Sequence, residues 1–121
     1  MGRFFALVLL SLTAAAATAQ GARDCSHARS QVEASDCAAA GWAESDAELN
    51  RLWSIVKPAA DARGRGKALL AAQRAWLTYR DATCTLESDR FQGGSIAPQV
   101  HAACLDRLTR QRNADLREML P

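Results

Sequence analysis

Four cysteines and two histidines are the residues of this 121-residue chain best suited to carry chemistry. Cys25 lies two residues before His27, and His101 lies three residues before Cys104. Two thiolates and two imidazoles would suit zinc if the fold brought them together. The alternative is that the even set of cysteines forms two disulfides, as is typical of small exported chains. We favour disulfides and expect no metal and no other cofactor.

Gln73 and Arg80 are polar residues in a stretch, "AAQRAWLTYRDATC" at 71–84, that otherwise has the pattern of an amphipathic helix. At 100° per residue both fall near the middle of its apolar stripe, and Arg112 lies in the same way on the stripe of a later segment. An ionised guanidinium is tolerated in a core only when it is paired, so each arginine predicts an acceptor. We expect Asp46 to pair with Arg80.

The acceptor expected near Arg112 is Asp115, which could also receive a hydrogen bond from Gln73. A functional alternative is that Gln73, Arg80 and Arg112 line an anion-binding pocket. Carboxylates are available nearby to satisfy the arginines, so we interpret these residues as polar members of the core that fix the helix register. This predicted polar core consists of Asp46, Gln73, Arg80 and Arg112.

Catalysis is not expected from this chain. A hydrolase needs a nucleophile with a base, or two carboxylates that face a cleft. No Ser/His/Asp set has an interpretable spacing, and the acidic run of Glu44, Asp46 and Glu48 is more simply a helix surface with one inward member. We therefore predict that the protein is not an enzyme.

Three helical segments are expected to position these residues, at about 28–61, 67–90 and 97–120. Pro58 and the "RGRG" at 63–66 separate the first two, and Pro58 is expected to kink or end the first helix early. A glycine of the "GGS" at 93–95 can end the second helix, and Ser95 can cap the third. Short links make consecutive helices antiparallel. The prediction is an all-α, up-down-up three-helix bundle.

The first 19 residues are interpreted as a cleaved signal peptide, which leaves residues 20–121 as one helical domain. A basic start, an apolar run too short to span a bilayer and the "ATA" at 17–19 are typical of such a signal. No cysteine follows the cleavage site directly, so no lipid anchor is expected, and no later segment resembles a membrane span. The predicted location is the periplasm or the exterior.

All four cysteines are expected at one end of the bundle, where more than one pairing is allowed. We favour Cys25–Cys37, which would clip an N-terminal arm to the first helix, and Cys84–Cys104, which would close the second hairpin. Without residues 1–19 the chain has 14 basic and 13 acidic side chains. A formal charge of about +1 argues against nucleic acid, which requires a concentrated basic face.

The order of several motifs resembles the LprI family, which is named for a lysozyme inhibitor. The resemblance covers nearly all of residues 20–121 and implies an exported, helical, disulfide-bonded domain that binds a protein partner, with lysozyme as the candidate. An alternative is a small envelope module that binds another protein or a peptidoglycan-related ligand. The motifs are the Cys25–Cys37 opening, "AESDAELN" at 43–50, "QRAWLTYRDATC" at 73–84, "GGSIAP" at 93–98 and "CLDRLTRQR" at 104–112.

The resemblance supplies no contact residues, so these are chosen from the sequence. A protruding loop can enter the sugar groove of a lysozyme, whereas a flat helix cannot. The acidic run on the first helix is the second choice. The predicted contact residues belong to the second hairpin and are Glu87, Asp89, Gly93, Gly94 and Ser95.

Overall fold

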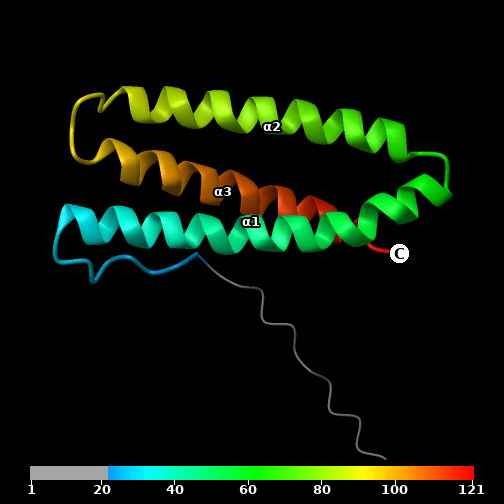
Figure 1. The fold of residues 1–121 in the computed structure, drawn as a ribbon, viewed down its shortest axis with the longest axis horizontal. Helices are drawn as coiled ribbons and strands as arrows, with labels where there is room; N and C mark the ends of the chain where they lie inside the picture. Colours follow the sequence, from blue (N-terminus) through cyan, green and yellow to red (C-terminus); the bar gives the residue numbers. More distant parts are fainter. Residues whose placement is uncertain (1–21) are drawn as a thin grey trace, which may run out of the picture.

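The protein is a bundle of three helices in a computed structural model that describes residues 22–121 (Figure 1). The helices are α1 (Gln31–Ala62), α2 (Gly66–Asp89) and α3 (Ala97–Arg117). They run up, down and up, and the described residues contain no strand, as predicted. The predicted signal peptide, residues 1–19, lies outside the described residues.

The start of α1 is defined by reciprocal hydrogen bonds. Ser30 occupies the N-cap, and its hydroxyl accepts a hydrogen bond from the backbone N–H of Glu33 at 3.1 Å. The carboxylate of Glu33 accepts from the backbone N–H of Arg29 at 2.9 Å. This arrangement resembles a capping box and satisfies N–H groups that have no partner within the helix.

Pro58 lies inside α1, so of the two predicted outcomes, a kink or an early end, the early end is wrong. A proline removes only one N–H from the hydrogen-bond ladder, and the helix can continue if it bends. Figure 1 shows the last turns of α1 bending towards the start of α2. The helix ends four residues after Pro58, at Ala62, and Gly64 then turns the chain with a φ of +72°.

The helices do not pack equally. The contact between α1 and α3 is the most extensive, and that between α1 and α2 is the smallest. One apolar cluster joins α1 to the end of α3, and a second surrounds the disulfide between α2 and α3. The first consists of Leu49, Leu52, Val56 and Leu116, and the second of Cys84, Cys104, Leu105 and Leu108.

Polar side chains lie between the two clusters along the α1–α3 contact. Asn113 is only 2% exposed, and its side-chain amide donates to the backbone carbonyl of Ser45 at 2.9 Å. Thr109 lies one helical turn earlier on the same face of α3 and is fully buried. Sequence reasoning missed these residues, although the spacing of Leu105, Thr109 and Asn113 already places them on one helical face.

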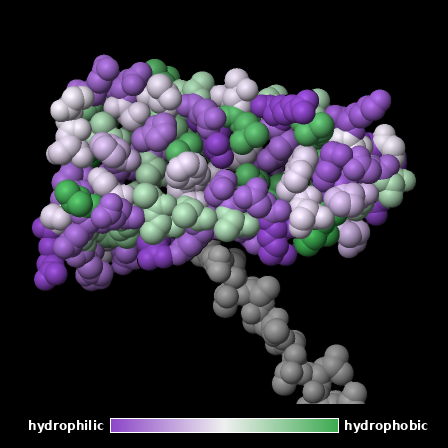
Figure 2. All heavy atoms as spheres, viewed as in Figure 1, coloured by the Kyte–Doolittle hydropathy of each residue, from purple (hydrophilic) through white to green (hydrophobic). Residues whose placement is uncertain are grey.

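The outer surface is mixed in character. Figure 2 shows hydrophilic and hydrophobic residues interspersed on one face of the bundle. Among residues 22–121, none of the helices combines the length and the apolar character that crossing a bilayer requires.

Candidate functional site

Two disulfides cross-link the described residues: one joins α2 to α3, and the other joins the N-terminal arm to α1. Cys84 and Cys104 are bonded with their Cα atoms 5.4 Å apart, and both are buried. Cys25 and Cys37 are bonded with their Cα atoms 5.9 Å apart. These are the two favoured pairings. All four thiols are thus consumed, which leaves no thiolates for the zinc site considered from the sequence.

A histidine strengthens the base of the second hairpin. The backbone carbonyl of Cys84 accepts a hydrogen bond from Nδ1 of His101 at 3.2 Å, and the hydroxyl of Ser88 lies 3.4 Å from the same nitrogen. These contacts join the last turns of α2 to the second turn of α3. His101 therefore holds the hairpin together beside the Cys84–Cys104 disulfide.

The last residue of α2 and the loop that leads to α3 form a segment that we call the tip (residues 89–96), which is exposed along its whole length. It is also ordered by backbone hydrogen bonds. The N–H of Phe91 donates to the carbonyl of Ser88 at 2.9 Å, and the N–H of Gly94 donates to the carbonyl of Phe91 at 2.8 Å. Consecutive turns of this kind limit the conformations of the loop, so a partner would meet a largely preformed surface.

The backbone of the tip favours glycine at two positions. Gly93 has a φ of +80°, the left-handed conformation that favours glycine. The prediction that a glycine ends α2 is wrong, because the helix ends at Asp89 with Arg90 at its C-cap and Gly93 lies within the loop. A Cβ on Gly94 would lie 3.0 Å from the carbonyl oxygen of Phe91, which is tighter than normal contact. Both glycines therefore serve the shape of the tip directly.

Ser95 does not cap α3, which corrects the sequence prediction. The N-cap position is Ile96, and no side chain accepts a hydrogen bond there. The helix begins one residue later than a Ser95 cap would require, with Pro98 in its first turn as expected. The side chain of Ser95 is exposed at the tip instead.

The charges at the tip are more balanced than its sequence indicates. The carboxylate of Glu87 is bonded to Arg107 of α3 at 2.7 Å. The guanidinium of Arg90 lies 5.9 Å from the ring centroid of Phe91. Among residues 22–121 Asp89 makes no ion pair, so it is the acidic group of the tip that remains available.

Two apolar side chains at the tip were not predicted as contact residues. Phe91 and Ile96 are each 38% exposed and flank the glycines. Aromatic anchors often dominate protein–protein binding energy. The signal that could have identified them is an aromatic and a β-branched residue on either side of "GGS". The candidate site is thus a hydrogen-bonded, nearly neutral loop with apolar edges.

The chain matches a protein family over almost all of its described length. Residues 22–116 match the family described as Lysozyme inhibitor LprI. The chain belongs to the LprI lysozyme-inhibitor family. An uncharacterized protein of Rhizobium meliloti (strain 1021) is 38% identical over 125 aligned residues, which cover 93% of this chain and 90% of that protein. No solved structure matches this chain.

In this LprI-family chain the motif at 73–84 supplies polar core residues. Gln73 and Arg80 are both buried, and the side chain of Arg112 is 11% exposed. Nε of Arg112 donates to Oε1 of Gln73 at 2.9 Å, which links α3 to α2. Nη1 of Arg112 also lies 3.8 Å from Oδ2 of Asp115, which confirms the predicted pairing of Asp115 with Arg112.

Arg80 does not pair with Asp46, so that predicted ion pair is wrong. Arg80 bonds instead to its neighbour Asp81, at 2.8 Å, and its guanidinium lies 5.2 Å from the ring centroid of Trp76. Asp46 is only partly buried on α1. The small contact between α1 and α2 explains the difference, because it leaves α3 rather than α1 as the main neighbour of α2.

The acidic run on α1 is largely neutralised within the LprI domain. Glu44 is paired with Arg23 of the N-terminal arm. Glu48 is bonded to Arg51 at 2.6 Å and to Arg117 at the end of α3 at 2.8 Å. These pairs satisfy two of its three carboxylates, which makes the run a weaker candidate for binding a partner than the tip.

The pKa of Glu48 follows from these contacts. The hydrogen bond from Arg51 is the largest effect and lowers its pKa; burial opposes this, and the hydrogen bond from Arg117 and the charges of both arginines lower the pKa further, from the ordinary value of 4.5 to about 2. A carboxyl group with a depressed pKa in the folded state contributes stability above its unfolded pKa. That contribution is lost as the pH falls from about 4.5 towards about 2.

Glu48→Gln is therefore expected to lower the free energy of unfolding by about 1–2 kcal/mol near pH 7 and by much less at pH 2. The half-exposed arginines are screened by solvent, so the full pKa shift is not converted into stability. Urea denaturation of both proteins from pH 7 to pH 2 measures this difference. If the two proteins lost stability in parallel over that range, the role given to Glu48 would be contradicted. A double-mutant cycle with Arg51→Gln would measure how much of the stabilisation comes from the Glu48–Arg51 pair.

Proposed function

We propose that this protein is a periplasmic inhibitor that binds lysozyme stoichiometrically through the tip, without a cofactor or catalytic residues. Membership of the LprI family is the observation that supports the activity. Two disulfides suit an oxidising compartment outside the cytoplasm. The proposed contact residues are Glu87, Asp89, Gly93, Gly94 and Ser95, to which the exposed apolar side chains of Phe91 and Ile96 are added.

The shape of the tip supports this assignment. Lysozymes cleave glycosidic bonds with two carboxyl groups that flank the scissile bond in a groove. A narrow loop that projects from the end of a bundle can enter such a groove and exclude the substrate. The tip is braced by the Cys84–Cys104 disulfide and by the Glu87–Arg107 ion pair, so little ordering is required on binding.

Charge supports a local rather than a long-range mode of binding. Common animal lysozymes are strongly basic, whereas this domain has a formal charge of about +1 after residue 19. Long-range attraction would therefore not accelerate the encounter. Asp89 supplies a local negative group, and Phe91 supplies apolar area at the edge of the tip.

A cell-wall lysis assay with several lysozyme types tests the proposal. The purified oxidised protein is titrated into a fixed concentration of each lysozyme. Residual activity should fall to its minimum near one equivalent for at least one type. A folded, disulfide-bonded protein that inhibits none of them would contradict the proposal and favour an envelope module that binds another partner.

Gly93→Asn combined with Ser95→Arg is expected to weaken inhibition by at least about 100-fold. Asparagine tolerates the left-handed backbone at position 93, and retained Gly94 preserves the close approach to Phe91. The arginine adds bulk and positive charge where a basic enzyme would dock. Unfolding free energy should change by less than about 1 kcal/mol, as for other exposed sites.

Ala47→Arg is the matched control because it adds the same charge on the exposed surface of α1, away from the tip. This control should inhibit like the parent protein. If the tip variant inhibited lysozyme as well as the parent protein, the tip would not be part of the binding site. Equal weakening by both variants would indicate that net charge, and not the tip, governs binding.

A further inference from the structure

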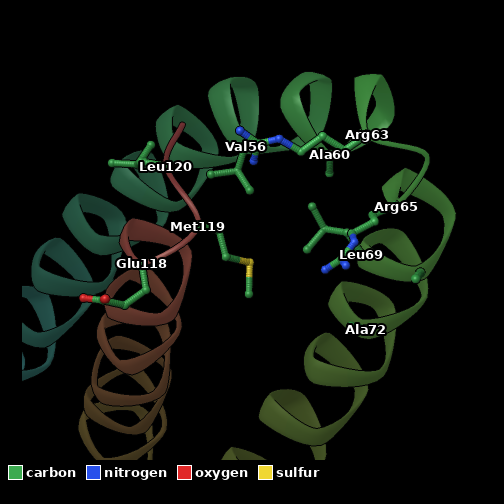
Figure 3. A pocket seen from close by; sticks show the side chains of 10 residues that line it. Val56, Ala60, Arg63, Arg65, Leu69, Ala72, Glu118, Met119 and Leu120 are labelled. Carbon is green, nitrogen blue, oxygen red and sulfur yellow. The ribbon is translucent and has the colours of Figure 1, made fainter.

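The end of the bundle opposite the tip contains an open groove. Helix α3 ends at Arg117, while α1 and α2 continue to the turn that joins them. A hollow of about 930 Å³ lies between the end of α1, the start of α2 and the segment that follows α3 (Figure 3). This volume is within the range of small-molecule binding sites, about 300–1,000 Å³.

The walls of the groove are apolar. Three alanines keep the helices from filling the space, and Figure 3 shows the side chain of Met119 pointing into it. Met119 and Leu120 are each 41% exposed, so a ligand that covered them would remove apolar surface from water. The apolar lining consists of Val56, Ala60, Ala68, Leu69, Ala72, Met119 and Leu120.

Two of the three charged side chains that line the groove are cationic. The guanidinium of Arg63 extends along the α1 side and that of Arg65 lies on the α2 side, whereas the carboxylate of Glu118 points away (Figure 3). Within residues 22–121, neither Arg63 nor Arg65 makes an ion pair. Both can therefore bind an anion at the edge of the apolar space.

This combination selects among ligands by their chemistry. The lining offers no side-chain hydroxyl or amide, and most backbone groups of the helical walls are bonded within the helices. A peptide would bring amide groups that find few partners there, which is costly when they are buried. A ligand with a continuous apolar chain and one anionic head group fits better. Its chain would contact the apolar walls, and its head group would pair with the arginines.

We propose that this groove binds a free long-chain carboxylate, of the fatty-acid type. The alkyl chain lies along the alanines and Met119, and the carboxylate is held between Arg63 and Arg65. The site is separate from the tip, at the other end of the bundle (Figure 1). Its residues are therefore different from those proposed to contact lysozyme.

Titration of the full oxidised protein with laurate, below its micelle concentration, tests the proposal. Trp53 and Trp76 pack against the neighbouring apolar cluster and provide a fluorescence signal, and calorimetry provides the stoichiometry. Binding should saturate near one equivalent and tighten about two- to fourfold for each methylene added from ten to fourteen carbons. Dodecyltrimethylammonium should bind at least about tenfold more weakly than laurate.

Two variants and a control locate the site. Arg63→Gln with Arg65→Gln should weaken laurate binding by at least about tenfold, and Ala72→Phe should block the space for the chain. Arg74→Gln removes another exposed cation of α2 that does not line the groove, and it should bind laurate like the parent. Circular dichroism verifies that each variant is folded.

Several results would overturn the proposal. These are the absence of saturable laurate binding, equal binding of the cationic amphiphile, and equal affinity of the double-arginine variant. Binding only to anionic phospholipid vesicles would mean that the groove contacts a membrane surface. Dimerisation without ligand, abolished by Ala72→Phe, would mean that the groove binds a second copy of this chain. Because the tip is unchanged in these variants, their lysozyme inhibition is a separate readout.

Discussion

Leu52→Ala is expected to lower the free energy of unfolding by about 3–4 kcal/mol. Leu52 is fully buried in the cluster that joins α1 to the end of α3. Truncation removes its apolar burial and leaves a cavity that the rigid helices can fill only in part. A domain of this size has a total stability of about 5–15 kcal/mol, so this single change would consume a large share.

Denaturant unfolding with a matched control checks the prediction. Leu86→Ala makes the same chemical change at a side chain that is 70% exposed on α2. The control should stay within about 0.5 kcal/mol of the parent. Equal losses in the two variants would mean that the α1–α3 contact does not form the principal core.

Cys84→Ala combined with Cys104→Ala is expected to cost about 3 kcal/mol of stability. The bond closes a loop with a sequence separation of 20 residues, and loops of that size lose about 3 kcal/mol of denatured-state entropy on cross-linking. Both cysteines are also buried within the second apolar cluster, so their removal loosens packing. Thermal and urea unfolding of the oxidised variant measure this loss.

The same variant should inhibit lysozyme less well than the parent while still folded. The disulfide braces the base of the tip, and its loss transfers the cost of ordering the loop to the binding step. Cys25→Ala with Cys37→Ala is the natural comparison, because that bond joins the N-terminal arm to α1 and its loss leaves α2 and α3 cross-linked. Stronger impairment by the loss of Cys25–Cys37 than by the loss of Cys84–Cys104 would contradict the proposed role of the tip.

The helices and their approximate ends follow from local signals in the sequence. Apolar residues at spacings of three and four predicted three helices, and α1, α2 and α3 begin and end within a few residues of the expected positions. Pro58 shows the limit of such signals. Whether a proline ends a helix or bends it depends on the packing of the turns on either side.

The interhelical partners of the polar residues were not predictable to the same degree. Gln73, Arg80 and Arg112 were recognised as buried because burial follows from their position on an apolar stripe. Which acceptor each would use depends on how the helices are rotated about their axes. Arg80 took Asp81 on its own helix, and Arg112 took Gln73 across the α2–α3 contact.

By itself, the sequence determined that this chain forms a disulfide-bonded, all-α domain, because helical periodicity, turn residues and an even set of cysteines are local properties. The tertiary structure decided that α1 packs chiefly on α3, which is not its neighbour along the chain. Only that arrangement buries Asn113 against Ser45, moves Asp46 away from Arg80 and leaves a groove beyond the end of α3. Such contacts join residues far apart in sequence, and their geometry depends on the shapes of whole helices.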